Sequence, residues 1–230
     1  SVLNQVIERD RDALMERTAD RPLPAGRVGA GDATLLGGVL SVLGLTLLVV
    51  AATPLAAALG ALTLVTYVAV YTPLKTRTSL NTLVGTVPGA LPPLIGAAAA
   101  TGTLSPSAWF LFALVTAWQL PHFLSIAWMY RADYERGGYA MLPVVTGGGR
   151  ATGRQIVLHA LLTVLVSLAA FPLGIAGRGY VAVALAAGLL LVGAGVRFLV
   201  RRDDASARLV LRASLVHLPA VLLAFAAGAA

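Results

Sequence analysis

The sequence predicts an all-α membrane protein, a polytopic bundle of transmembrane helices. Two observations predict this fold class: the composition and the grouping of the apolar residues. The 230 residues are 58% hydrophobic and 12% charged, with a mean hydropathy of +0.84. Soluble domains carry about 25% charged residues, so this chain has more apolar surface than an aqueous core can bury. A lipid bilayer is therefore its natural solvent.

Seven apolar segments are long enough to cross the hydrocarbon core as helices, which takes about 17–25 residues each. Turn residues such as Thr53-Pro54 and Ser105-Pro106 separate them, and the Gly and Pro residues inside them are tolerated in membrane helices. Because no linker or internal repeat divides the chain, we expect one domain over residues 1–230. The segments run over 33–52, 55–72, 83–100, 107–130, 155–176, 180–200 and 209–229.

The basic residues predict how the helices are oriented. Every Lys and Arg except Arg178 falls in 9–31, 73–82, 131–154 or 197–212, and these four segments share one side of the membrane. Loops rich in Lys and Arg stay in the cytoplasm, so we expect this side to be cytoplasmic. The same rule explains the net charge of +7 without a nucleic-acid partner. All ten acidic residues lie in or beside the same segments, and the absence of Cys excludes disulfides.

Acidic residues at the start of the chain predict an anionic stripe. Asn4, Glu8, Asp12 and Glu16 recur every four residues, which places them on one face of an α-helix. Carboxylates at this spacing repel one another and invite a cation. Neighbouring arginines could supply this positive charge by forming ion pairs with the carboxylates on a solvent-exposed helix face. The alternative is a hard divalent ion such as Mg²⁺, which prefers oxygen ligands and bridges to substrate phosphates.

A histidine inside the fourth apolar segment is the second candidate. His122 and Asp133 are eleven residues apart, so on one continuous helix they would face within about 20° of each other. His122 would then lie inside the membrane, on a stripe that ends in Asp133. Ionisable groups at that depth are usually functional, and we favour a functional role over packing.

A third candidate is the loop between the second and third apolar segments. Its only charges are Lys75 and Arg77. In the predicted orientation they face the two acidic segments across the same membrane surface, where Lys and Arg commonly bind phosphate. The alternative is that these two residues only set the orientation of the helices.

Together these segments resemble the UbiA superfamily of intramembrane prenyltransferases, and within it the branch that modifies haem. Asn4, Glu8 and Asp12 match the family motif N-x-x-x-D-x-x-x-D, with Glu8 in place of the usual Asp. The second D-x-x-x-D motif of other members is reduced here to Asp133, Glu135 and the deeper His122. Further matches are Met15-Glu16-Arg17-Thr18, Arg21-Pro22-Leu23, Tyr71-Thr72-Pro73-Leu74-Lys75, Asn81-Thr82, Gly85, Pro121-His122-Phe123, Tyr130-Arg131, Asp133-Tyr134, Gly138 and Met141-Leu142-Pro143.

The resemblance implies an activity and a set of site residues. The activity is transfer of a farnesyl group from farnesyl diphosphate to the vinyl group of haem b, which gives haem O and diphosphate. Haem b is then a substrate, Mg²⁺ the cofactor, and downstream haem-modifying or oxidase-assembly proteins further partners. The implied metal ligands are Asn4, Glu8, Asp12 and Asp133. The implied substrate-binding residues are Arg17, Arg21, Arg77 and His122, and the implied catalytic residues are Lys75, Arg131, Asp133, His122 and Tyr134.

The resemblance also implies a fold of nine transmembrane helices around a lipid-open cavity, in a bacterial inner membrane. Since seven segments are found and the Asn4 motif stands at the start, we expect about two N-terminal helices to be missing from this sequence. Two other functions stay open. A related prenyltransferase could act on a quinone-precursor aromatic acid or a chlorophyll-type ring. A transporter is more distant, because transporters place polar groups near the bilayer midplane, whereas these carboxylates lie at the membrane edge.

Overall fold

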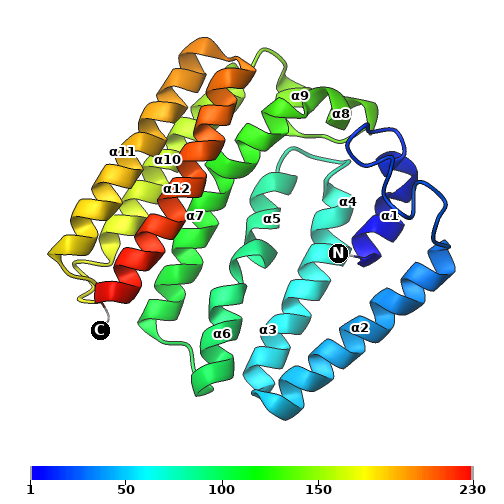
Figure 1. The fold of residues 1–230 in the computed structure, drawn as a ribbon, viewed down its shortest axis with the longest axis horizontal. Coiled ribbons are helices and arrows are strands. Elements are labelled where there is room, and N and C mark those ends of the chain that lie inside the picture. The colour runs from blue at the N-terminus through cyan, green and yellow to red at the C-terminus, as the bar shows by residue number, and fades with distance from the viewer. Residues whose placement is uncertain (1, 229–230) are drawn as a thin grey trace.

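A computed structural model describes residues 2–228 and shows one helical bundle, which confirms the predicted fold class (Figure 1). Within those residues the regular structure is helical, with one π-helical segment, η1. The helices are α1 (Val2–Asp12), α2 (Ala30–Ala51), α3 (Pro54–Val65), η1 (Thr66–Tyr71), α4 (Thr72–Leu74), α5 (Asn81–Ala90), α6 (Pro92–Thr101), α7 (Pro106–Met129), α8 (Arg131–Arg136), α9 (Leu142–Thr146), α10 (Arg150–Ala169), α11 (Arg178–Arg201) and α12 (Asp204–Gly228).

Seven stretches of the described residues are long and apolar enough to cross a membrane, and each overlaps one predicted segment. Most of α2 is exposed, as expected of a helix that faces lipid. The length, composition and exposed apolar faces of these helices identify an integral membrane protein. The stretches are Ala30–Ala51, Pro54–Leu74, Asn81–Thr101, Pro106–Met129, Arg150–Ala169, Arg178–Arg201 and Asp204–Gly228.

Local signals explain where two of the membrane helices begin. Thr53 and Ser105 cap α3 and α7 by accepting hydrogen bonds from Ala56 N at 3.1 Å and Ala108 N at 3.2 Å. A Pro follows each cap, at a position where its missing N–H is not needed. The predicted span 155–176 was wrong at both ends: α10 starts at Arg150 and ends at Ala169. A turn over 170–176 follows, which contains one Pro and a Gly of positive φ.

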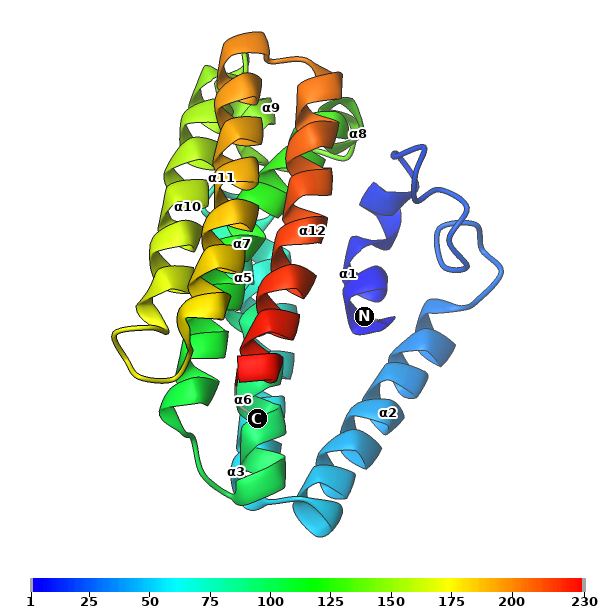
Figure 2. The same cartoon turned by 60° about the vertical axis from the view of Figure 1, so that its left-hand side comes forward.

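Helices α7, α10, α11 and α12 form the most closely packed part of the bundle (Figures 1 and 2). Small residues let their backbones approach: a β-carbon at Gly153 would meet Leu199, and one at Gly188 would meet Val164. By contrast, α2 contacts mainly α1 and α3. Figure 2 shows α1 between α2 and the remainder of the bundle.

One end of the bundle gathers the charged segments, and we call it the charged end. The last turn of α1, helices α4, α8 and α9, and the turn between α11 and α12 lie there, at the top of Figure 1. The α6–α7 and α10–α11 connections lie at the opposite end. The segments rich in Lys and Arg therefore lie at one end of the fold, as predicted from the sequence.

Candidate active site

Helix α1 turns its polar stripe into the protein. Its buried residues are Asn4, Glu8 and Asp12, whose exposed fractions are 6%, 5% and 1%. The four-residue spacing places them on one face, as predicted. The helix stops at Asp12, where Thr18 Oγ1 donates to the Asp12 carbonyl at 2.8 Å. The extension of the stripe to Glu16 was wrong, because Glu16 lies beyond the helix end and its side chain is 84% exposed.

The buried carboxylates of α1 each pair with a cation from another segment. Lys75, just after α4, places its Nζ 2.9 Å from Glu8 Oε1. Arg21, in the loop after α1, donates to Asp12 Oδ2 at 2.8 Å. Asn4 joins the first pair by donating to Glu8 Oε2 at 2.6 Å. Burial of a charge is costly unless it is paired, so these contacts allow two carboxylates to be buried here.

The π-helical segment η1 positions the wall opposite α1. Such segments are rare and often occur at functional sites. Thr72, directly after η1, donates to Asn4 Oδ1 at 2.9 Å and to the Tyr67 carbonyl at 2.8 Å. Lys75 Nζ lies 4.7 Å from the centre of the Tyr71 ring, within range of a cation–π interaction. The segment therefore aligns two tyrosines and a lysine along the stripe of α1.

These groups surround a polar cavity of about 140 Å³ at the charged end. It brings together seven residues predicted from the sequence, and adds six to which sequence reasoning assigned no role. The predicted ones are Asn4, Glu8, Asp12, Arg17, Arg21, Lys75 and Tyr134. The added ones are Met15, Thr18, Tyr67, Tyr71, Tyr139 and Met141.

Two tyrosines from α8 and the loop after it close the polar cavity. Arg17 donates to the Tyr134 hydroxyl at 3.3 Å, and its guanidinium lies 5.7 Å from that ring. Burial raises the pKa of Tyr134, although the nearby Arg17 opposes the shift. Tyr139 is 3% exposed, and its hydroxyl makes no hydrogen bond within the described residues. Burial and the negative charge of Glu8 raise the pKa of Tyr139, so its phenol remains a proton donor.

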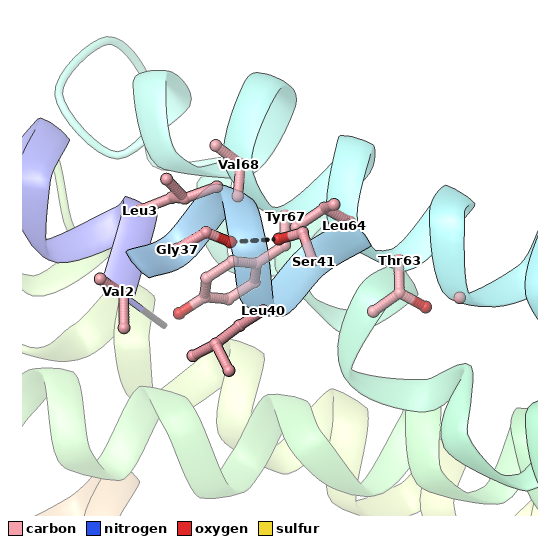
Figure 3. Close-up of a pocket in the computed structure, with 10 residues that line it drawn as sticks. Val2, Leu3, Gly37, Leu40, Ser41, Thr63, Leu64, Tyr67 and Val68 are labelled. Carbon is pink, nitrogen blue, oxygen red and sulfur yellow. Dashed lines mark hydrogen bonds between the residues drawn. The ribbon is translucent and has the colours of Figure 1, made fainter. Parts of the chain in front are cut away.

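A larger apolar cavity of about 480 Å³ lies beside the polar one, and Tyr67 lines both. Figure 3 shows its lining side chains, which come from the start of α1 and from α2, α3 and η1. The Ser41 hydroxyl on its wall donates to the Gly37 carbonyl at 2.7 Å, drawn dashed in Figure 3. Thr63 likewise donates to Leu59 O at 2.8 Å. Because these hydroxyls are satisfied, the cavity suits an apolar guest.

Asp133 and two predicted arginines lie outside the polar cavity. Asp133 pairs with Arg136 and accepts from Glu16 N at 3.3 Å. Arg131 pairs with Asp204 at 2.8 Å. Arg77 is exposed. The roles predicted for Asp133, Arg131 and Arg77 remain predictions, and these contacts give each of the first two a structural partner.

The predicted stripe from His122 to Asp133 was wrong. Helix α7 ends at Met129, and the backbone turns at Tyr130 (φ −107°, ψ 22°) before α8 begins. His122 instead faces α12, with its Nδ1 2.9 Å from Ser214 Oγ. Its ring stacks on Trp118 with 4.7 Å between the ring centroids. His122 is therefore half-buried between α7 and α12, and it does not line the polar cavity.

The polar cavity combines oxygen ligands with excess positive charge. Its two carboxylates face three cations, Lys75, Arg17 and Arg21. The Asn4 and Glu8 oxygens already converge on one cation, the Lys75 ammonium, at 3.4 and 2.9 Å. This donor set fits Mg²⁺, which takes oxygen ligands and usually completes its shell with water or phosphate. Within residues 2–228 no three acidic or histidine side chains meet at metal-binding distance.

Comparisons with known proteins agree with this geometry. The UbiA prenyltransferase family model matches residues 1–226. A protoheme IX farnesyltransferase from Solibacter usitatus is 48% identical over 221 residues, which cover 96% of this chain and 76% of the relative. The protoheme IX farnesyltransferase from Salinibacter ruber is 47% identical, over 96% of this chain and 78% of the relative.

Solved structures share the fold. A digeranylgeranylglyceryl phosphate synthase superposes with a TM-score of 0.79 at 19% identity, over 99% of this chain and 79% of that one. The apo structure of a UbiA homolog from Aeropyrum pernix K1 gives a TM-score of 0.70 at 20% identity, over 96% and 82%. At these identities the likeness is one of fold.

Proposed function

Because this chain belongs to the UbiA prenyltransferase family, we propose that it transfers a farnesyl group from farnesyl diphosphate to the vinyl group of haem b, giving haem O and diphosphate. The observation that carries the proposal is the pair of adjoining cavities that meet at Tyr67. A prenyl diphosphate has the same two parts, an anionic head and an apolar tail. The named relatives do not favour a quinone-precursor or chlorophyll-type acceptor, or transport.

The polar cavity would bind the diphosphate head. Lys75, Arg17 and Arg21 supply cations, and Tyr139 supplies a hydroxyl donor that has no other partner within the described residues. As the allylic C–O bond breaks, its electron pair leaves with the diphosphate, and preorganised donors stabilise that charge. Asn4, Glu8 and Asp12 would hold Mg²⁺, which supplies charge neutralisation for the diphosphate when bound.

The apolar cavity would hold the farnesyl chain and exclude water from the carbon that becomes cationic. Tyr67 stands where the two cavities meet, and Tyr71 lines the polar cavity. The face of the Tyr71 ring already accepts a cation, the Lys75 ammonium, at 4.7 Å. An allylic cation formed nearby would be stabilised by the same ring quadrupole. The π electrons of the haem b vinyl group then form the new C–C bond to the farnesyl carbon. The cation left on the adjacent vinyl carbon takes up a water molecule, which loses a proton to give the hydroxyl group of haem O.

We further propose that the charged end faces the cytoplasm of a bacterial inner membrane, since it carries nearly all Lys and Arg residues. His122, half-buried between α7 and α12, is our candidate for a residue that binds the acceptor, haem b. Haem-modifying or oxidase-assembly proteins as downstream partners remain a prediction. We likewise propose that residues 1–230 form one prenyltransferase domain.

The test is synthesis of haem O by the purified protein in lipid nanodiscs that contain farnesyl diphosphate, haem b and Mg²⁺. Extracted haems are separated by chromatography and identified by mass spectrometry. Lys75→Ala should abolish product, whereas Arg9→Ala should not, because Arg9 is exposed and forms its ion pair with the exposed Asp10. Product from a quinone precursor but not from haem b would overturn the proposed acceptor.

A further inference from the structure

A separate basic cavity of about 390 Å³ lies between α10 and α11 at the charged end. It is lined by Arg150, Arg154, Leu199, Val200 and Arg202, none of which lines the polar cavity of the candidate active site. The ion pairs found among residues 2–228 use other arginines. The basic cavity therefore holds three arginines that have no carboxylate partner in the described part of the chain.

Two of the three arginines repel each other by their position. Arg150 and Arg154 are four residues apart at the start of α10, so they share one face of the helix. Like charges at this spacing destabilise a helix unless a counter-charge is present. The first N–H groups of α10 also lack a side-chain cap, since Gly149 precedes the helix. They add partial positive charge at the same place.

The third arginine reaches the basic cavity through a disfavoured backbone conformation. Arg202 follows the last residue of α11 with φ 54° and ψ 39°, and it is the only non-glycine residue of positive φ within residues 2–228. Gly or Asn usually occupies this position, because other residues are strained there. A β-carbon at Gly149 would lie 3.4 Å from Cβ of Arg202, so Arg202 lies against the start of α10. Strain of this kind is commonly retained at functional sites.

The remaining walls indicate what the ligand is. Leu199 and Val200 are apolar. The exposed residues Leu158 and Leu165 follow Arg154 by four and eleven positions on α10, and the exposed Val196 precedes Val200 by four on α11, so they share the same helical faces. A free anion has no apolar part to place against these walls. A molecule with a phosphate and hydrocarbon chains satisfies both parts, because Arg binds phosphate in a bidentate manner and the chains cover the apolar faces.

We propose that the basic cavity binds the phosphate headgroup of an anionic membrane phospholipid, with its acyl chains along the exposed apolar faces of α10 and α11. Basic sites between transmembrane helices on the cytoplasmic side suit such headgroups. A zwitterionic lipid fits less well, because its ammonium group would approach three arginines that have no acidic neighbour in the cavity. The bound lipid would stabilise the packing of the start of α10 against the end of α11.

The test measures binding of phosphatidylglycerol to the purified protein by native mass spectrometry. The cavity variant is Arg150→Gln/Arg154→Gln. The matched control is Arg197→Gln/Arg208→Gln, which removes the same charge from arginines that are likewise exposed but lie outside the cavity. We expect the cavity variant to bind phosphatidylglycerol about tenfold more weakly or worse, and the control to change less than about twofold. An equal loss in both variants would overturn the proposal, because it would show only a diffuse surface charge.

Two further arms identify the ligand, and one variant controls for folding. Binding of phosphatidylcholine as strong as that of phosphatidylglycerol would overturn the anionic selectivity. Inorganic phosphate that displaces phosphatidylglycerol at equal concentration would overturn the lipid as the ligand. Arg202→Asn removes a cation and introduces a residue that tolerates positive φ. It should retain its unfolding temperature without lipid and lose stabilisation by phosphatidylglycerol, and full stabilisation would contradict the proposal.

Discussion

Replacing Lys75 with Ala should both destabilise the protein and weaken substrate binding, and the two effects can be separated. The side chains of Lys75 and Glu8 are only 12% and 7% exposed and lie 2.9 Å apart. Removing one partner of a buried pair leaves the other charge uncompensated, which costs about 3–5 kcal/mol. Lys75→Ala should therefore lower the unfolding temperature clearly. A fall in substrate affinity alone could then reflect partial unfolding.

The Glu8→Gln background removes this ambiguity. With the carboxylate gone, Lys75→Ala leaves no buried anion without a partner, so most of the stability should return. The ammonium that would contact the diphosphate is still absent. A hydrogen bond to a charged group contributes about 1.5–3 kcal/mol, which corresponds to a loss of affinity of about 10- to 150-fold.

The assay compares farnesyl diphosphate binding by calorimetry in Glu8→Gln and in Glu8→Gln/Lys75→Ala, with unfolding temperatures measured in parallel. This double-mutant comparison isolates the contribution of Lys75 to binding. Equal affinity in the two variants would refute a contact between Lys75 and the diphosphate. An unchanged unfolding temperature in Lys75→Ala alone would show that the Lys75–Glu8 pair is not buried in solution.

Three further predictions concern the α1 carboxylates, Tyr139 and, outside the polar cavity, His122. Asp12→Ala should remove most metal-dependent turnover, whereas Glu8→Asp should be tolerated; full turnover with excess chelator would refute a metal site. Tyr139→Phe should weaken farnesyl diphosphate binding about fivefold, as expected for one lost hydrogen bond. Because the pKa of Tyr139 is raised, its phenol stays protonated, and the ratio of the two proteins' affinities for farnesyl diphosphate should stay constant between about pH 6 and about pH 9. A ratio that changes across this range would contradict the role of the phenol as a donor. His122→Ala should lower haem affinity and spare farnesyl diphosphate binding, measured separately in nanodiscs, while an active His122→Gln enzyme with normal haem affinity would leave His122 structural.

The sequence by itself determined the seven membrane helices and the stripe of α1. Both are local properties: span length and hydropathy depend on consecutive residues, and the spacing of Asn4, Glu8 and Asp12 maps directly onto one helical face. The predictions made from helical periodicity were wrong where a helix ends without a Gly or Pro to mark its end. The ends of α1 at Asp12 and of α7 at Met129 separated Glu16 and Asp133 from the stripes predicted for them.

Only the tertiary structure decided which distant groups meet. Lys75 reaches Glu8 across 67 positions of chain, and the unpartnered hydroxyl of Tyr139 enters the polar cavity from a loop that no spacing rule marks. Arg131 has a side chain that commonly binds phosphate, yet it forms an ion pair with Asp204. Residue type and spacing describe one helix at a time, whereas a buried charge takes its partner from whichever helix packs against it, and that packing is a property of the whole bundle.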